Sequence, residues 1–190
     1  MYSSLLQHIQ RFVSLTEEEK DILSSQLLLK KLNKKENVLE EGQVCAANYF
    51  IAKGCLRLYY INDKGTEQIV QFGIENWWIT DFISLEKQLP SCFYLQAIES
   101  STVIALEKSL QEDLFEKIPK LERYFRLVTQ KAYGAAQLRI KYIFDLSGEE
   151  RYDQFTRLFP DFVQRIPQYM LASYLGFTPE FLSTLRAKKR

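Results

Sequence analysis

Residues 166–190, IPQYMLASYLGFTPEFLSTLRAKKR, predict two helices joined by a tight turn. Apolar residues recur at helical spacing on both sides of Gly176, which interrupts the pattern and can adopt the left-handed backbone that ends a helix sharply. This pattern is typical of a helix-turn-helix unit, and an ordinary pair of packed helices shows the same spacing. The periodic positions are Met170, Leu171, Tyr174 and Leu175 before the turn, and Phe181, Leu182 and Leu185 after it.

The start of the second helix is marked by three consecutive residues. Thr178 is a suitable N-cap because its hydroxyl can accept a hydrogen bond from a free amide of the first turn. Pro179 suits the first helical position, where no amide donor is needed, and Glu180 complements the positive end of the helix. A helix fixed in this way and ending in basic residues has the form of one that reads the major groove of DNA. The alternative is an αα-hairpin with a frayed basic tail.

Charge is distributed unevenly along the chain. The 25 basic and 24 acidic residues leave a net charge of +1, which does not by itself indicate a polyanionic partner. From residue 163 onward, five basic residues stand against Glu180 alone, a net charge of +4, so the preceding part carries −3. Positive charge concentrated beside a helix-turn-helix pattern favours contact with phosphates.

Length and composition indicate a globular protein with one large or two small domains. The chain has 190 residues, 46% of them hydrophobic and 14% aromatic, which is enough for substantial cores. Cys45, Cys55 and Cys92 are widely separated and include no C-x-x-C pair, so neither a disulfide framework nor a local metal cluster is indicated. The N-terminus has no basic segment followed by a long apolar run. We expect a cytoplasmic protein without a membrane partner.

The N-terminal part is expected to be helical. A first short helix is predicted from the apolar spacing in residues 5–12, and a second begins with the capping signature of Thr16 and Glu19 and carries Leu27. His8, the only histidine, lies in the first helix. We expect it at a surface or an interface, because no further metal ligands lie near it, and no metal site is predicted.

Between Leu32 and Leu106 the pattern changes to short runs of aromatic and branched residues separated by turn residues. Residues 62–65, NDKG, predict a hairpin turn in which Gly65 can take positive φ. Strands at this spacing are typical of a sandwich, a jelly roll or a small barrel. The expected strands span residues 49–52, 56–61, 69–72, 77–79, 94–97 and 102–106.

A helix of unusual length is predicted next. Ser109 and Glu112 give a capping signature, and Pro119 can begin a helix that runs to about Asp145, a length of about 39 Å from the rise per residue. A stripe at alternating steps of four and three resembles a coiled-coil seam and favours self-association, although it could instead pack on the β block. The stripe consists of Leu121, Phe125, Val128, Ala132, Ala135, Arg139 and Tyr142.

Two further segments lie between this helix and the C-terminal pair. Ser147 and Glu150 form another capping signature, which predicts a helix to about Leu158. Residues 159–161, FPD, break that helix. Residues 162–166 are expected to form a short extended pair or turn, as in the wing that accompanies many helix-turn-helix domains.

In this order, the segments resemble the Crp/Fnr-type transcription regulators, and especially their short Bacteroidetes-like branch. The resemblance covers nearly the whole chain. The stretches that carry it are GQVCAANYFIAKGCLRLYYINDKGTEQIVQF at 42–72, SGEERYDQF at 147–155 and ASYLGFTPEFLS at 172–183.

The resemblance implies an α+β fold with an N-terminal β jelly roll of the cyclic-nucleotide-binding type, a long dimerisation helix and a C-terminal winged helix-turn-helix. The corresponding divisions are residues 1–118, 119–145 and 146–190. It also implies a regulator, and not an enzyme, that binds double-stranded DNA as a homodimer, with RNA polymerase as a further partner. The jelly roll would sense a small-molecule effector, and no cofactor is predicted.

The positions that hold cyclic AMP in this family differ here. Members that bind it carry a Gly-Glu pair and, further along the chain, an Arg followed by Ser or Thr, whereas this sequence has Thr80-Asp81 and Ser91-Cys92. Ser91 cannot make the bidentate charge-assisted contact that a buried phosphate requires, so an effector other than cyclic AMP is expected. Three scattered cysteines and one histidine do not match the iron-sulfur or haem branches. The candidate pocket walls are Phe72, Trp78, Thr80, Asp81, Ser91 and Tyr94, although the aromatic members could simply belong to the core.

Family members often read DNA through the pattern E-x-x-S-R in the second helix. Glu180 and Ser183 match this pattern, and Thr184 stands in place of the arginine. Glu180 can accept a hydrogen bond from a cytosine amino group, whereas Thr184 lacks the guanidinium that reads guanine, and Arg186 points in another direction. We therefore expect a different base preference. The candidate DNA-contacting residues are Gln168, Tyr169, Thr178, Glu180, Ser183, Thr184, Arg186, Lys188 and Lys189.

Two other classes of function were compared with this hypothesis. A cupin-like metalloenzyme would use the same β architecture, but such sites hold their metal with several histidines and this chain has one. A small-molecule-binding or protein-interaction module without specific DNA binding is the remaining alternative, because of Thr184.

Overall fold

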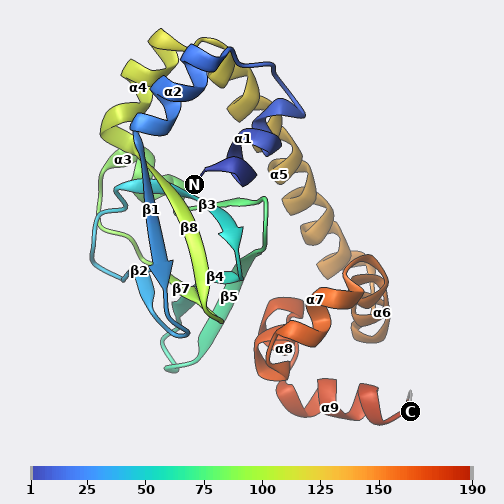
Figure 1. Cartoon of the computed structure of the whole chain (residues 1–190). Helices are drawn as coiled ribbons and strands as arrows, with labels where there is room; N and C mark the ends of the chain where they lie inside the picture. Colours follow the sequence, from blue (N-terminus) through green and yellow to red (C-terminus); the bar gives the residue numbers. More distant parts are fainter. Residues whose placement is uncertain (1, 189–190) are drawn as a thin grey trace.

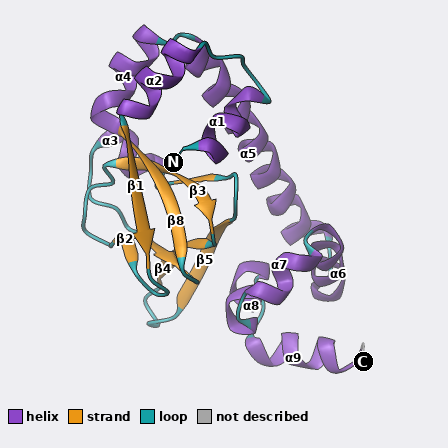
Figure 2. Cartoon of the chain, in the orientation of Figure 1, coloured by secondary structure: helices purple, strands orange, loops and turns teal. Residues whose placement is uncertain are grey.

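The computed structural model of this chain describes residues 2–188, without the side chain of Lys188. Its strands form one β-sandwich, with helices packed over one side (Figure 1). The long helix α5 (Lys120–Asp145) runs from these helices to a second, C-terminal group of helices. Figure 2 shows that the described strands all lie in the sandwich and that the C-terminal group is helical. The expected mixed fold is therefore confirmed.

The sandwich consists of two four-stranded sheets in which the paired strands run antiparallel. The strand order is β1-β8-β3-β6 in the first sheet and β2-β7-β4-β5 in the second. The strands are β1 (Leu27–Leu32), β2 (Asn37–Leu39), β3 (Ala47–Lys53), β4 (Leu56–Ile61), β5 (Glu67–Gly73), β6 (Trp78–Ile79), β7 (Tyr94–Ala97) and β8 (Ser101–Glu107). The six expected strands correspond to β3–β8, while β1 and β2 were not predicted.

One boundary prediction at the start of the sandwich was wrong. The second helix, α2 (Glu17–Ser25), keeps its predicted capping box at Thr16 but ends before Leu27. Leu27 instead begins β1, where it pairs with Leu106 of β8. Cross-strand pairing and burial of Leu27 thus override the helical spacing that included it.

Alternation along the strands gives the sandwich three apolar surfaces. In β8, Val103 and Ala105 face the space between the sheets, whereas Ile104 and Leu106 face outward into a second cluster. In β4, Leu58 faces inward, and Tyr59 faces the opposite way. Both outer faces of the sandwich are therefore apolar and need a cover.

Helices cover the outer face of the first sheet. They are α1 (Ser3–Gln10), α2, α4 (Lys108–Lys117) and the first half of α5, and their buried side chains pack with Phe50 and Ile104. Tyr124 of α5 is fully buried here, and its hydroxyl lies 2.8 Å from Trp78 Nε1, which donates to it, and 2.7 Å from His8 Nδ1. His8 thus lies at an interface between helices, one of the two positions expected for it.

Two short helices, α3 and α4, differ from prediction. Helix α3 (Phe82–Lys87) was not predicted. Helix α4 begins at Lys108, directly after β8, and its N-cap residue Glu107 makes no side-chain capping bond. The predicted cap, Ser109, lies inside the helix, because pairing of β8 extends to Glu107 and the amide of Lys108 bonds to Ala46 O at 2.8 Å.

The C-terminal group contains α6 (Gly148–Leu158), α7 (Pro160–Arg165), α8 (Gln168–Leu175) and α9 (Pro179–Lys188). The predicted capping box of Ser147 and Glu150 is present at the start of α6. The predicted wing at 162–166 was wrong, because Pro160 begins a short helix that buries Phe162 and Val163. Within residues 2–188 no strand follows β8, so the described helix-turn-helix has no wing.

The predicted stripe of α5 is only partly covered within the monomer, because its members Ala132 and Ala135 are exposed. Leu121, Phe125 and Val128 pack in the cluster over the first sheet, and Arg139 contacts β5. A neighbouring face of the same helix carries exposed apolar side chains instead. These are Tyr133 (65% exposed), Ala136, Ile140 (56%) and Phe144 (83%), which recur at steps of three and four.

Candidate functional site

Local hydrogen bonds fix the turn between α8 and α9. Gly176 has a φ of 77°, in the left-handed region, and the amide of Phe177 donates to Ala172 O at 2.9 Å. Thr178 Oγ1 accepts a hydrogen bond from the amide of Phe181 at 3.3 Å and so caps α9. The local roles predicted for Gly176 and Thr178 are confirmed.

Helix α9 buries one face and exposes the other. Leu182 and Leu185 are buried and belong to the same apolar cluster as Leu171 of α8. The opposite face borders a shallow hollow that is largely open to solvent. Its lining residues are Pro179, Glu180, Ser183, Thr184 and Ala187.

The structure brings together three of the residues predicted to contact DNA. Glu180, Ser183 and Thr184 line the same hollow on α9. Arg186 is half-buried and is not among the lining residues. Gln168 and Tyr169 are exposed at the start of α8, and Thr178 is exposed at the start of α9. The side chain of Lys188 and the whole of Lys189 lie outside the described residues.

The C-terminal helices cover the outer face of the second sheet. Tyr59 and Phe72 of that sheet share one apolar cluster with Phe162 of α7 and Leu171 of α8. The rings of Phe72 and Phe162 meet edge to face, with centroids 5.2 Å apart. The α8–α9 pair is therefore packed against the sandwich, and its connection through α5 is not its only contact with the rest of the chain.

Strand β5 lies at the edge of its sheet, so the backbone groups on its open side need partners from elsewhere. Ser173 of α8 accepts from the amide of Ile69 at 3.0 Å and donates to the carbonyl of Glu67 at 3.1 Å. The guanidinium of Arg139 donates to the carbonyl of Val70 at 2.6 Å. Helices α5 and α8 thus supply hydrogen-bond partners to backbone groups of Glu67, Ile69 and Val70 on this edge.

Arg139 connects three elements. Besides Val70, its guanidinium donates to the carbonyl of Tyr174 at 2.9 Å and lies 4.2 Å from the centre of the Tyr174 ring. Burial lowers the pKa of Arg139, and among the described residues no carboxylate pairs with it. Its charge is therefore balanced by carbonyl dipoles and a ring face.

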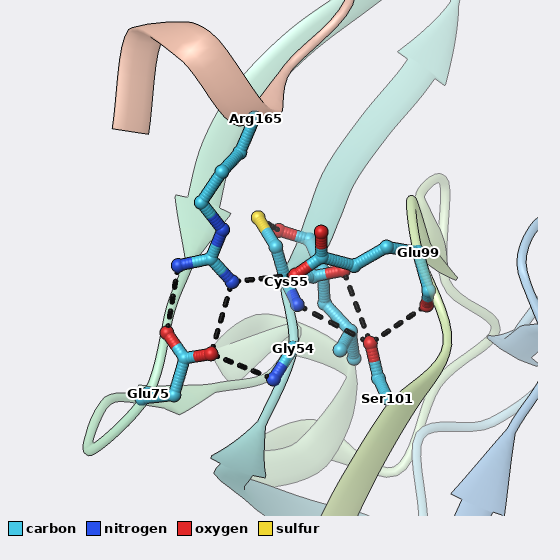
Figure 3. A network of polar contacts seen from close by, with 7 residues as sticks. Gly54, Cys55, Glu75, Glu99, Ser101 and Arg165 are labelled. Atoms are coloured by element: carbon cyan, nitrogen blue, oxygen red, sulfur yellow. Dashed lines mark hydrogen bonds and ion pairs between the residues drawn. The ribbon is translucent and has the colours of Figure 1, made fainter. Parts of the chain in front are cut away.

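A second polar junction lies around Arg165 of α7 (Figure 3). Its guanidinium donates to both carboxylate oxygens of Glu75, each at 2.9 Å, and also pairs with Glu99. Glu75 in turn accepts from the amide of Gly54 at 2.8 Å. Gly54 has a φ of 97°, and a Cβ there would lie 2.3 Å from Ser101 Oγ, so only glycine fits at this point.

Electrostatics at this junction favour the charged pair. Burial by itself would raise the pKa of Glu75, but hydrogen bonds from Arg165, its own amide and Gly54 bring the pKa below the ordinary value. Hydrogen bonds to Glu75 and Glu99 raise the pKa of Arg165. The neighbouring Cys55 is buried, and its pKa is raised by that burial, so its thiol stays protonated at neutral pH.

The polar residues predicted for the effector pocket meet at the start of α3. Asp81 caps this helix: one oxygen accepts from the amides of Ile83 at 3.0 Å and Ser84 at 3.2 Å. Its other oxygen accepts from Ser91 Oγ at 2.7 Å. Thr80 donates to Ala47 O at 3.0 Å. All three are buried, and the amides that would bind an anion are already taken by the chain's own carboxylate.

The one buried arginine of the β-sandwich is also fully engaged. Arg57 of β4 pairs with Glu67, and its Nη2 donates to Gln96 Oε1 at 2.7 Å. It lies 3.9 Å from the centre of the Tyr59 ring. A phosphate would have to displace Glu67 to reach this guanidinium. The residues present at α3 and β4 therefore do not fit a cyclic nucleotide phosphate.

The three aromatic residues predicted as pocket walls lie in two different apolar clusters: Phe72 and Tyr94 lie at the cluster under the C-terminal helices, and Trp78 lies at the cluster around α5. Phe72 packs on Phe162 under the C-terminal helices, and Trp78 belongs to the cluster at α5. Tyr94 stacks on Tyr59, with ring centroids 5.1 Å apart. The structure thus does not gather the six predicted residues into one pocket.

The described residues offer neither a metal cluster nor a membrane-spanning helix. Across residues 2–188, no group of three or more His, Cys, Asp and Glu side chains is placed to hold a metal ion. Cys45 and Cys55 are buried, and Cys92 is exposed. No helix of this described part combines the length and apolar character needed to cross a membrane.

Comparison with known proteins agrees with this geometry. Residues 29–117 match the family model for the cyclic nucleotide-binding domain. The chain is 28% identical over 184 residues to the anaerobic regulatory protein of Pasteurella multocida, covering 90% of this chain and 67% of that protein. It is also 28% identical to the fumarate and nitrate reduction regulatory protein of Vibrio cholerae, with 90% and 73% covered. The chain is thus similar over most of its length to regulators of the Fnr type.

The similarity to Crp/Fnr regulators extends to the three-dimensional arrangement. The structure of FixK2 from Bradyrhizobium japonicum superimposes with a TM-score of 0.72 at 18% identity, covering 85% of this chain and 83% of that one. Crp/Fnr regulators bind DNA and act as dimers, and they are not enzymes.

Several residues of this site were missed at the level of sequence. Ala187 lies one turn beyond Ser183 and Thr184, and the helical spacing alone could have included it. Arg139 is the one charged residue in the predicted apolar stripe of α5. A charged residue at such a position indicates a polar contact in a buried environment. Arg165 and Ser173 carry no such signal, because their partners lie in distant β-strands.

Proposed function

We propose that this chain regulates transcription by binding a two-fold symmetric duplex site as a homodimer, with α9 of each copy in a major groove. The observation that carries this proposal is the exposed face of α9, where Glu180, Ser183 and Thr184 lie together while Leu182 and Leu185 anchor the helix. Side chains at these spacings can reach successive base edges.

Charge and surface composition support the same arrangement. The net charge of +4 from residue 163 onward favours phosphate contact by Arg186, Lys188 and Lys189, with Gln168, Tyr169 and Thr178 as further candidates near the backbone. The exposed stripe of α5, defined by Tyr133, Ala136, Ile140 and Phe144, is a surface of the kind that a second copy of a long helix covers.

The β-sandwich is proposed as a sensor whose effector is not a cyclic nucleotide. Asp81 occupies the amides of Ile83 and Ser84 at the start of α3, and Arg57 is paired with Glu67, so these groups are not available to a phosphate. In this proposal residues 1–118 sense, 119–145 dimerise and 146–190 bind DNA. The protein would act in the cytoplasm together with RNA polymerase.

DNA selection by the full chain tests the first part of the proposal. A pool of random duplexes should yield a palindromic motif whose half-site centres lie about one helical turn apart. The affinity for that motif should fall steeply with salt, in proportion to the number of phosphate contacts. Recovery of no preferred sequence, with a folded protein, would refute specific DNA binding and favour a protein-interaction module.

A thermal-shift series tests the second part. Cyclic AMP and cyclic GMP at millimolar concentration should leave the unfolding temperature unchanged, whereas a true effector raises it through preferential binding to the folded state. The matched control is the variant Asp81→Ala, which frees the amides of α3. A clear stabilisation of the wild-type chain by either nucleotide would contradict the assignment.

A further inference from the structure

The described face of α9 that borders the hollow carries no positive charge, although a helix that binds DNA would be expected to present one. Of the described side chains on this face, Glu180 is the only charged one, and Ser183, Thr184 and Ala187 are small. Arg186 follows Thr184 by two positions, about 200° around the helix, and is half-buried. No described side chain on this face can present the guanidinium fork that reads guanine.

Thr184 uses its hydroxyl within the helix. Thr184 Oγ1 donates to the carbonyl of Glu180, one turn earlier, at 3.0 Å. The donor of the side chain is therefore consumed, and the side chain offers its γ-methyl group as a further contact surface. Ala187 places a second methyl group at the same hollow.

Next to the Thr184 methyl group, Glu180 offers a carboxylate that can only accept hydrogen bonds. Hydrogen bonds from its own amide and from the Thr178 hydroxyl lower the pKa of Glu180, so its carboxylate is ionised at neutral pH. An ionised carboxylate accepts hydrogen bonds and donates none. In the major groove it can pair with the amino group of cytosine.

We propose that Thr184 is a specificity-determining residue that recognises the 5-methyl group of thymine, at a base pair next to the one read by Glu180. This inference rests on the proposed function, because it assigns the base code of the same helix. The thymine methyl is the one apolar group that a base pair presents in the major groove, and a threonine methyl is a suitable partner for it. With the hydroxyl engaged by Glu180 O, the contact is apolar and not a hydrogen bond.

Two substitutions of Thr184 separate the contribution of its methyl group from that of its hydroxyl. Thr184→Val keeps the shape and the γ-methyl but loses the hydroxyl, and Thr184→Ser keeps the hydroxyl but loses the methyl. Both changes lie on an exposed face, and equal unfolding temperatures confirm that the variants are folded. The base preference selected from random duplexes is then compared among the wild type and both variants.

Replacing thymine by deoxyuridine in the selected site removes the 5-methyl group from the DNA side. Wild type and Thr184→Val should bind the thymine site roughly fourfold more tightly than the deoxyuridine site, the value expected for burial of one methyl group. Thr184→Ser should bind both sites equally.

Three outcomes decide the proposal. The pattern above supports it. Equal binding of thymine and deoxyuridine by the wild type, or a preference kept by Ser and lost by Val, overturns it while leaving specific DNA binding intact. If the wild-type chain selects no sequence at all, the proposed function fails together with this inference.

Discussion

The two halves of α5 have opposite surroundings. In the first half, Leu121 and Tyr124 are fully buried against the sandwich. In the second half, Tyr133, Ile140 and Phe144 are more than half exposed, and Arg139 provides the polar contacts to β5 and α8. One continuous helix thus serves first as a core element and then as a surface that carries apolar side chains.

The difference shows why the periodic pattern of α5 was ambiguous. Leu121, Phe125 and Val128 recur at coiled-coil spacing, yet they pack within the monomer. The face available to a second copy lies beside them, at Ile140 and Phe144. Spacing indicates that a helix has an apolar face, but the partner of that face depends on what the rest of the chain places there.

The largest expected effect comes from the buried half. Leu121→Ala should lower the free energy of unfolding by about 2–5 kcal/mol, because it removes a fully buried side chain and leaves a cavity. Urea unfolding followed by circular dichroism measures this. The matched change in the exposed half, Ile140→Ala, should alter the unfolding free energy of the monomer by about 0.5 kcal/mol or less. Equal losses in the two variants would contradict the comparison.

Substitution of Arg139 tests the polar contacts that the second half of α5 makes with β5 and α8. Arg139→Met retains an apolar stem over Tyr174 but leaves the carbonyls of Val70 and Tyr174 without their donor. The expected loss is about 1.5–3 kcal/mol, the range for hydrogen bonds made by a charged group. The control is Arg126→Met on the exposed side of the first half, where the partner is Gln130 alone. Similar stabilities for both variants would mean that the Arg139 contacts contribute little.

The exposed stripe is tested through the oligomeric state. Ile140→Glu should raise the dissociation constant of the dimer by about tenfold or more, since a buried charge costs at least about 1.4 kcal/mol at an apolar interface. Sedimentation equilibrium measures the dissociation constant. The control Lys141→Glu introduces the same side chain on a neighbouring face and should leave the dimer intact. An unchanged dimer in the Ile140→Glu variant would place the interface elsewhere.

The smallest expected effect is a pH dependence in the buried half. Burial, together with the charges of Arg11 and Lys131, lowers the pKa of His8 below its ordinary value of 6.5. The unfolded chain therefore binds a proton more readily than the folded chain, and stability that is complete above pH 6.5 declines as the pH falls below it.

Unfolding temperatures measured from pH 8 to pH 5 would show this decline. His8→Asn provides the matched control, because an amide oxygen can accept from the Tyr124 hydroxyl without titrating. The difference between the wild type and this variant should grow as the pH is lowered. Parallel curves would show that His8 does not contribute to the pH dependence.

Local chemistry made most of the fold predictable. The strands β3 to β8 follow from their alternation, and the caps at Thr16, Ser147 and Thr178 follow from short-range hydrogen bonds. The wing and the end of α2 were mispredicted because burial of Phe162 and Leu27 depends on distant partners. Spacing alone cannot encode such partners.

The candidate site shows the same difference between local patterns, which the sequence predicts, and contacts between distant segments, which it does not. Glu180, Ser183 and Thr184 lie together because they share one helix face, which the helical period predicts. The six predicted pocket residues do not lie together, because they come from different strands and loops. The contacts of Ser173 and Arg165 with β5 and with Glu75 join segments about half the chain apart, and no local pattern announces them.

The closure of β5 by Ser173 and Arg139 has a consequence for the behaviour of fragments. An open edge strand presents unpaired amides and carbonyls that act as a template for another chain, and the apolar face around Phe72 lies beside it. A piece of this chain that ended before α6 would keep Arg139 but lose Ser173, and it would leave the amide of Ile69, the carbonyl of Glu67 and the apolar face around Phe72 without their cover. Removal of the C-terminal helices should therefore promote association between copies of the β-sandwich through this edge and face.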